Sequence, residues 1–248
     1  MKNRNHYLSL SLVLFTCFSL FVCTSCNKAR AIEIKGQSVN CKLIFEENFD
    51  NGLDNWQVEQ MEGGTVEINK GKLEIDDVKG CTVWLKEKFE GPIVIKYDVF
   101  IIQDGGANDR VSDLNCFWMA TDPKNPDNLF ANSEKRGGKF SNYDDLQLYY
   151  MGVGGNFNKT TRFRRYVGNG ERPLLPHHDL SDPKFMLEAN KTYKIKIVAN
   201  NGVIQYYRDN VLFADFVDKD PYTSGYFGLR TVKNHMTVDN FKVYSIEK

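Results

Sequence analysis

The chain has 248 residues, 13% of them aromatic, and its 32 basic residues balance its 32 acidic residues. A net charge of zero gives no global attraction to nucleic acid. The sequence contains no phosphate loop, dinucleotide fingerprint, G-x-S-x-G or H-E-x-x-H motif, so we expect no nucleotide cofactor. The length suits one large β domain, whose core is large enough to be stable without a disulfide or a structural metal.

The N-terminus has the layout of a secretory signal. Two basic residues precede an uncharged apolar run over residues 7–22, which is shorter than the roughly 20 residues that span a bilayer, so a cleaved signal is favoured over an anchor helix. The run ends in Cys-Thr-Ser-Cys, which resembles a lipobox, in which small residues precede an acylated cysteine. We predict a lipoprotein signal peptide over residues 1–25, with Cys26 lipidated and Cys23 as the alternative acceptor. The mature protein would then be anchored in the cell envelope, in the periplasm or on the outer-membrane surface.

Residues 26–41 are polar and predict a tether, whereas residues 42–248 predict the folded domain. Within that domain, residues 65–75 alternate apolar and polar side chains on both sides of a Lys-Gly turn, as a β-hairpin does. Similar patterns predict further strands at residues 81–89, 92–102, 115–120, 146–153, 193–197, 203–207, 211–216, 226–232 and 236–246.

These short strands, without a helical period of any length, predict an all-β fold in which two antiparallel sheets pack as a sandwich. A long β-barrel is the alternative. Segments 45–50 and 237–243 are expected to pair as the first and last strands. They contain Glu47 and Asp239, which could share a calcium ion, although salt bridges or turn hydrogen bonds explain the same residues.

The predicted mature chain has three cysteines besides Cys26, namely Cys41, Cys81 and Cys116. Each lies in an apolar strand, and no C-x-x-C or Cys/His spacing occurs. We therefore predict buried thiols and no metal site, and leave one disulfide among them open.

A run of basic residues follows Thr161. In an extended strand Arg162, Arg164 and Tyr166 point to one face, and Phe163 points to the other. If Phe163 faces the core, the arginines lie on the open side of the sheet, where guanidinium groups could hold carboxylates in pairs of hydrogen bonds. The competing explanation is a solvated strand whose arginines pair with nearby acids, namely Asp144, Asp145 or Glu171.

The neighbouring residues mix aromatic and hydrogen-bonding groups, as sugar sites do: Tyr149, Tyr150, Asn156, Asn158, Tyr166, His177 and His178. Asn115 could line the same groove, since Trp118 on that strand is expected in the core. His177 and His178 supply a general acid or base, or are a surface pair without a role, and His235 is expected to be structural. Asp144 and Asp145 face opposite ways in a strand, so glycosidic hydrolysis would also need Glu171 or Asp179.

Several segments carry a family resemblance, the most specific being Thr161-Arg-Phe-Arg-Arg-Tyr166. With residues 172–174, 193–197, 204–207, 224–230 and 239–241, it resembles an uncharacterised family of exported Bacteroidetes proteins, which is similar to the YesU-like proteins found beside rhamnogalacturonan-degrading enzymes. The resemblance covers most of residues 43–246. It implies a concanavalin A-like jelly roll and activity as a polysaccharide lyase or glycoside hydrolase, and it carries over no catalytic residues.

The leading hypothesis is an exported enzyme that acts on acidic, pectic glycans by β-elimination, which needs a cation on the uronate carboxylate and a base near the C5 proton. Arg162 and Arg164 would neutralise the carboxylate, and Tyr149 or His177 would be the base. Tyr150 replaces Tyr149 if the strand register shifts by one. The residues expected to position sugar rings are Asn115, Asn156 and Tyr166. The alternatives are a noncatalytic carbohydrate-binding lipoprotein, a glycoside hydrolase, or an adhesive surface protein without a polar groove.

Overall fold

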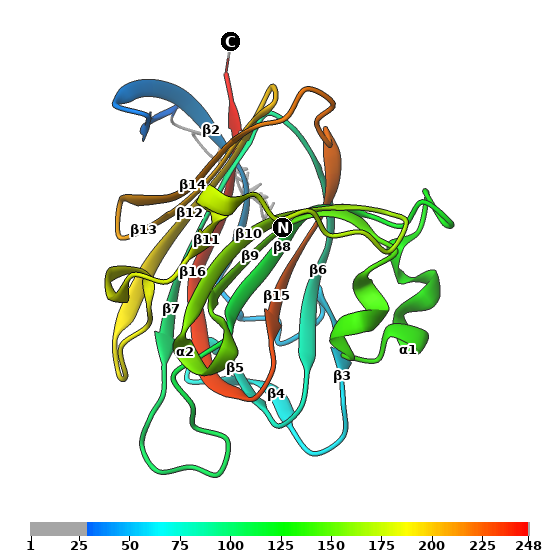
Figure 1. Cartoon of the computed structure of the whole chain (residues 1–248), viewed down its shortest axis with the longest axis vertical. Helices are drawn as coiled ribbons and strands as arrows, with labels where there is room; N and C mark the ends of the chain where they lie inside the picture. Colours follow the sequence, from blue (N-terminus) through cyan, green and yellow to red (C-terminus); the bar gives the residue numbers. More distant parts are fainter. Residues whose placement is uncertain (1–28, 248) are drawn as a thin grey trace, which may run out of the picture.

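The computed structural model describes residues 29–247, and two antiparallel sheets face each other across one core (Figure 1). The predicted all-β sandwich is confirmed. The predicted signal peptide and Cys26 lie outside the described residues. Within those residues, no helix is long and apolar enough to cross a membrane.

The first sheet, sheet A, has nine strands. Its main path runs through β1 (Arg30–Ile34), β2 (Gln37–Glu47), β16 (Asn234–Ile246), β7 (Ile93–Ile101), β12 (Thr192–Asn200), β13 (Val203–Arg208) and β14 (Val211–Val217). The predicted hairpin of β4 (Thr65–Asn69) and β5 (Lys72–Asp77) joins this sheet through β16.

The second sheet, sheet B, has seven strands. Their order is β11 (Asp179–Leu180), β10 (Thr160–Val167), β9 (Gln147–Gly154), β8 (Leu114–Thr121), β15 (Ser224–Thr231), β6 (Cys81–Glu90) and β3 (Trp56–Gln60).

The core forms because alternate side chains of both sheets point inward. On β12, Tyr193, Ile195 and Ile197 are buried, whereas Lys194 is exposed. From sheet B, Phe163 and Trp118 enter the same core. Full burial of such side chains contributes about 1.5–3 kcal/mol each, so the inward face of every strand is fixed.

The chain ends pair as expected, but the predicted tether is corrected. In the β2–β16 pair, Phe241 lies opposite Glu47 and Val243 opposite Phe45. Residues 30–41, however, form β1 and the start of β2, a hairpin rather than a polar tether. Its residues Ile32 and Ile34 are buried in an apolar cluster with Cys41, and this burial explains the ordered strand.

The three described cysteines are free and buried, as predicted: Cys41, Cys81 and Cys116. Burial raises the pKa of the Cys116 thiol to about 12. A thiol with so high a pKa stays protonated near neutral pH and is a poor nucleophile.

Residues 122–146 form an insertion over part of the outer face of sheet B (Figure 1). It contains the short helices η1 (Leu129–Asn132), α1 (Ser133–Arg136) and η2 (Phe140–Tyr143). Tyr143 packs there against Trp84 and Phe117. This second apolar cluster, which includes Phe117 of β8 and Tyr166 of β10, covers one part of the outer face. The part of the same strands around Asn115, Gly152 and Arg162 is open and lines a pocket.

Candidate functional site

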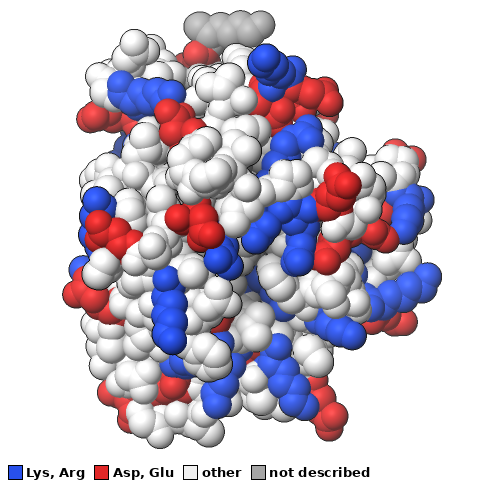
Figure 2. Space-filling view, in the orientation of Figure 1, with Lys and Arg blue, Asp and Glu red and all other residues white. Residues whose placement is uncertain are grey.

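The open part of the outer face of sheet B contains a pocket of about 500 Å³. We call it the arginine pocket, because four arginines line it together with Asn115 and Tyr150: Arg110, Arg162, Arg164 and Arg172. Figure 2 shows a hollow near the middle of this face with Lys and Arg side chains gathered around it.

Strand pairing brings the predicted residues together. Asn115 on β8 and Arg162 on β10 both lie opposite Gly152 of β9. In the neighbouring row, Arg164 lies opposite Tyr150. Since Phe163 is in the core, the arginines occupy the outer face, and the predicted orientation of this strand is confirmed.

Gly152 makes room for the phenol of Tyr150. A Cβ atom at position 152 would overlap the hydroxyl of Tyr150, which therefore lies over the backbone between Asn115 and Arg162. Burial raises the pKa of Tyr150 well above its usual value, so the phenol stays neutral and can donate a hydrogen bond. Gly152 was not predicted as a site residue, although a glycine inside a strand is a signal of close approach.

Three of the four arginines have carboxylate partners. Arg162 donates to Asp179 through Nε at 2.8 Å and Nη2 at 3.2 Å. Arg172 lies 3.3 Å from Asp144, and Arg110 lies 2.6 Å from Asp113.

Arg164 differs from the other three. Its Nη1 donates to the carbonyl oxygen of Arg172 at 2.6 Å, and no carboxylate among residues 29–247 forms an ion pair with it. Burial and the neighbouring charges of Arg172 and Arg162 lower its pKa, yet a guanidinium stays charged in proteins. The pocket therefore has an excess positive charge centred on Arg164, suited to an anion.

Two further polar groups lie in the pocket wall. Burial raises the pKa of Asp113, against hydrogen bonds from Ser112 and Arg110. The amide oxygen of Asn115 is buried without a hydrogen-bond partner among the described residues.

Residues 75–241 match the family model of a domain of unknown function, DUF6250. The chain belongs to the DUF6250 family. No curated protein matches it in sequence.

Solved structures share the fold of this DUF6250 chain. A Bacillus subtilis protein of unknown function with a galectin-like fold has 18% identity, covers 89% of this chain and 99% of its own, and has a TM-score of 0.65. An endo-β-1,3-glucanase from Pyrococcus furiosus has 14% identity, coverage of 88% and 98%, and a TM-score of 0.56. The carbohydrate-binding module CBM66 from Bacillus subtilis has 14% identity, coverage of 78% and 97%, and a TM-score of 0.52. These similarities confirm the jelly-roll fold, and the resemblance to YesU-like proteins and the Bacteroidetes origin stay predictions.

Three predicted site residues lie outside the arginine pocket and are corrected. Tyr149 points into the core between the sheets, where its hydroxyl donates to Asp218 at 2.6 Å. His177 is exposed in η3 (Pro176–His178) against His178, and does not line the pocket. Tyr166 is on the predicted face but fully buried beneath Arg172, so it supports that arginine. Tyr150, the alternative to Tyr149, is the tyrosine that lines the pocket.

Asn156 does line the pocket and donates to Thr160 Oγ1 at 3.2 Å. It belongs to α2 (Gly155–Asn158), a short turn between β9 and β10. The pocket is also lined by Arg110, Asp113, Phe157 and Arg172. These residues were not predicted from the sequence, because they come from loops and turns.

The acidic residues considered for glycosidic hydrolysis do not form a catalytic pair. Asp144 pairs with Arg172 and Asp145 with Lys124, Glu171 is exposed, and Asp179 binds Arg162. Glu47, the calcium candidate, accepts hydrogen bonds from Phe49 N, Asn55 and Trp56. Asp239 lies 3.8 Å from Lys72. Hydrogen bonds and an ion pair thus account for both residues, and residues 29–247 contain no cluster of three or more metal-ligating side chains.

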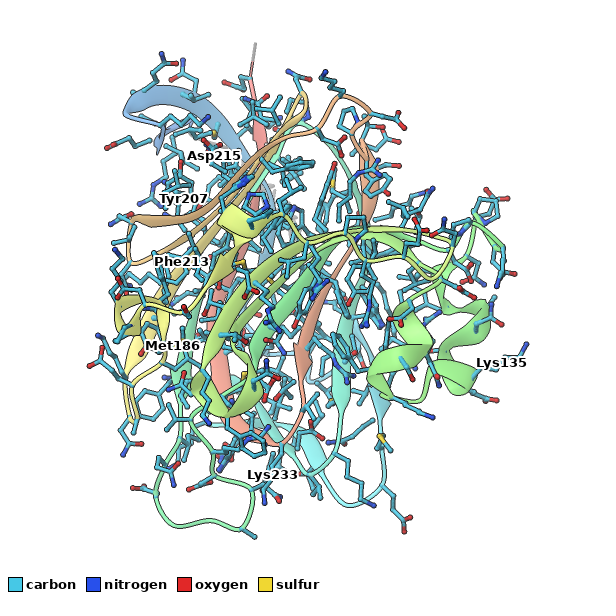
Figure 3. The ribbon with its side chains drawn as sticks, viewed as in Figure 1. Lys135, Met186, Tyr207, Phe213, Asp215 and Lys233 are labelled. Carbon is cyan, nitrogen blue, oxygen red and sulfur yellow. The ribbon has the colours of Figure 1, made fainter. Side chains whose placement is uncertain are left out.

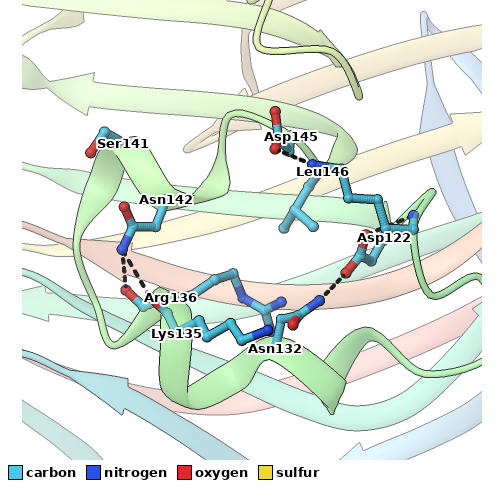
Figure 4. A pocket seen from close by; sticks show the side chains of 9 residues that line it. Asp122, Asn132, Lys135, Arg136, Ser141, Asn142, Asp145 and Leu146 are labelled. Atoms are coloured by element: carbon cyan, nitrogen blue, oxygen red, sulfur yellow. Dashed lines mark hydrogen bonds and ion pairs between the residues drawn. The ribbon is translucent and has the colours of Figure 1, made fainter.

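A second pocket of about 480 Å³ lies on the insertion (Figure 4). Its polar side chains bind one another: Lys124 contacts Asp145 at 2.6 Å, and Asn132 donates to Asp122 at 3.0 Å. Lys135 at its edge extends away from the sheets (Figure 3). In this second pocket Lys124 is paired with Asp145 and Arg136 with Glu59. Arg164 has no carboxylate partner among residues 29–247, so the arginine pocket is the stronger candidate for an anionic ligand.

Proposed function

We propose that this chain is a carbohydrate-active protein that binds an acidic oligosaccharide in the arginine pocket. The observation that carries the proposal is Arg164, a half-buried guanidinium without a carboxylate partner among residues 29–247, flanked by Arg162 and Arg172. A sugar carboxylate would supply the missing negative charge, and hydrogen bonds to charged groups contribute about 1.5–3 kcal/mol.

The rest of the pocket suits a sugar as well as an anion. Tyr150 and Asn156 present a phenol and an amide beside the arginines, and such groups meet the hydroxyls of a pyranose. The fold adds support, since CBM66 and the endo-β-1,3-glucanase are carbohydrate proteins by their names. A uronate of pectic type is the ligand we propose first, in a lipoprotein held in the cell envelope through Cys26.

A second candidate function is β-elimination in the same pocket. Besides the arginines, Asp113 and Tyr150 are the titratable side chains that line it. A carboxylate base could remove the C5 proton of a uronate while a neutral phenol protonates the leaving oxygen. The raised pKa of Asp113 brings it nearer to neutral pH, which favours such a role.

Glycoside hydrolysis is favoured less. It requires two carboxyl groups about 5–9.5 Å apart, and Asp113 is the one carboxyl group among the described residues that line the arginine pocket. Binding, with or without elimination, therefore remains the proposal.

Calorimetric titration of the purified chain with uronate oligosaccharides and matched neutral oligosaccharides tests the proposal. We expect binding of the acidic series only, and a loss of at least about tenfold for Arg164→Gln. Arg30→Gln, at an exposed arginine of β1, is the matched control and should bind as the wild type does. Equal binding of both series, or full affinity in Arg164→Gln, would contradict the proposal. A rise in the absorbance of unsaturated uronates during incubation would show that the chain also catalyses β-elimination.

A further inference from the structure

We propose that Phe157 is a stacking platform for the sugar ring next to the acidic one, so that the pocket recognises at least a disaccharide unit. The inference rests on the function proposed above and extends it to a second ring. Phe157 lines the arginine pocket together with Arg162 and Arg164.

Phe157 is the most exposed large hydrophobic side chain of residues 29–247, with 74% of its surface accessible. Single exposed apolar residues are common on protein surfaces, so exposure by itself decides nothing. The wall of a charged pocket is an unusual place for a bare aromatic ring, because folding gains almost nothing from leaving it in water.

The backbone that presents the ring is strained. Asn156, Phe157 and Asn158 have φ values of 52°, 59° and 62°, so three successive residues without a glycine occupy the left-handed region. Asparagine tolerates that region, whereas a bulky phenylalanine there is an outlier. Gly154, with φ of 68°, leads into the turn.

Surrounding contacts hold this turn in place. Asn158 accepts a hydrogen bond from Leu187 N and donates one to Leu187 O, both at 2.9 Å. Lys159 N donates to Gly155 O at 2.9 Å, and Asn156 donates to Thr160. These contacts thus hold Phe157 in a backbone conformation that is unfavourable for phenylalanine. Backbone strain of this kind is common at ligand sites.

Arg110 supports the ring from one side. Its guanidinium carbon lies 5.1 Å from the centroid of Phe157, and Asp113 fixes the same guanidinium at 2.6 Å. A ring backed by a fixed cation and otherwise open to solvent can receive the apolar face of a pyranose. The surrounding arginines disfavour a purely apolar partner, since such a partner would have to desolvate their charges.

The substitution Phe157→Asn separates this role from a structural one. Asparagine fits the left-handed turn better than phenylalanine does, so the variant should melt at the same temperature as the wild type or higher. Its affinity for a uronate monosaccharide should be unchanged. Its affinity for the disaccharide and trisaccharide of the same series should fall about tenfold, and Phe157→Trp should keep the wild-type affinity.

Val217→Ala is the matched control, because Val217 is an apolar side chain with 66% exposure on β14 of the other sheet. It should change neither affinity. If Phe157→Asn lost equal affinity for the monosaccharide and the oligosaccharides, or lost none for either, the stacking platform would be overturned. The proposed function would still stand if uronate binding depended on Arg164. A wild-type chain that binds no uronate at all would overturn both.

Discussion

The hydroxyl of Tyr150 lies so close to Gly152, two residues along the same strand, that a Cβ atom on Gly152 would overlap it. This close approach sets the floor of the arginine pocket between Asn115 and Arg162. A side chain at position 152 would force the phenol out of its place.

Gly152→Ala should therefore disturb both the fold and the ligand site. Overpacking of this kind costs about 1–3 kcal/mol of unfolding free energy, and displacement of Tyr150 should weaken uronate binding. Urea denaturation and calorimetric titration measure the two effects. Gly155→Ala is the control for stability alone, since its new Cβ would meet Thr160 at 3.4 Å, an ordinary contact, while Gly155 itself lines the pocket. Similar losses of stability in both variants would argue against the close approach as the cause.

Asp179→Asn should strengthen the binding of an acidic ligand. Asp179 holds two donors of Arg162 and so competes with a sugar carboxylate for that guanidinium. The gain should reach up to about fivefold, because an exposed ion pair contributes at most about 1 kcal/mol, and it should shrink at high salt. Asp182→Asn, which removes an exposed carboxylate paired with Lys184, should leave affinity unchanged. Weaker binding in Asp179→Asn would contradict the predicted competition.

The orientation of β10 could be predicted because strands have a period of two. Once Phe163 is assigned to the core, Arg162 and Arg164 must face outward. The same rule could not choose between Tyr149 and Tyr150, because that choice depends on which face of β9 meets the core, and both residues are aromatic and fit either side.

The site residues that lie on loops could not be predicted from the sequence for a different reason. Arg110 reaches the pocket from a loop whose Asp109 contacts His235 at 2.8 Å, more than a hundred positions away in the chain. Phe157 depends on a left-handed turn held by Leu187. Gly154-Gly155-Asn156 was the available signal of such a turn, but it does not reveal which side chain the turn presents.

Cys26 should carry the lipid anchor. Growth with a labelled fatty acid should label the wild-type protein and Cys23→Ser, whereas Cys26→Ser should lose the label and leave the membrane fraction. Label that persists in Cys26→Ser and disappears in Cys23→Ser would move the acceptor to Cys23. Absence of label in all three proteins would contradict the predicted lipid anchor.

His235 should make the stability of the fold depend on pH. Its ring nitrogens lie 2.8 Å from Glu74 and Asp109. Burial lowers the pKa of His235, but the hydrogen bonds to Glu74 and Asp109 outweigh it and the pKa is raised. The stability that the charged ring contributes is thus fully present below the unfolded value of about 6.5 and is lost as the pH rises through the folded value.

The two carboxylates act in the opposite direction. The hydrogen bond from His235 lowers the pKa of Glu74, and backbone and His235 hydrogen bonds lower that of Asp109 against its burial. The stability that the two charged carboxylates contribute is present above about pH 4.3, and it is lost as the pH falls through their pKa values in the folded state. The difference in urea midpoint between wild type and His235→Gln should therefore be larger at about pH 5.5 than at about pH 9. His177→Gln, at an exposed histidine, should show no difference, and a pH-independent gap for His235→Gln would contradict the prediction.

Glu59 should anchor the insertion to sheet B. Its buried carboxylate accepts hydrogen bonds from Ser133 and Tyr143, each at 2.6 Å, and from Arg136 Nε at 3.0 Å. Glu59→Gln leaves the Arg136 guanidinium buried without a counter-charge, which costs about 3–5 kcal/mol of unfolding free energy. Chemical denaturation measures this loss.

Asp145→Asn provides the matched control, because it removes a carboxylate from an exposed ion pair of the same insertion and should cost at most about 1 kcal/mol. The insertion also carries Phe140, which lines the arginine pocket. Glu59→Gln should therefore weaken uronate binding at temperatures where most of the protein is still folded, whereas Asp145→Asn should not. Unchanged stability in Glu59→Gln would show that the insertion is held by its apolar contacts with Trp84 and Phe117 alone.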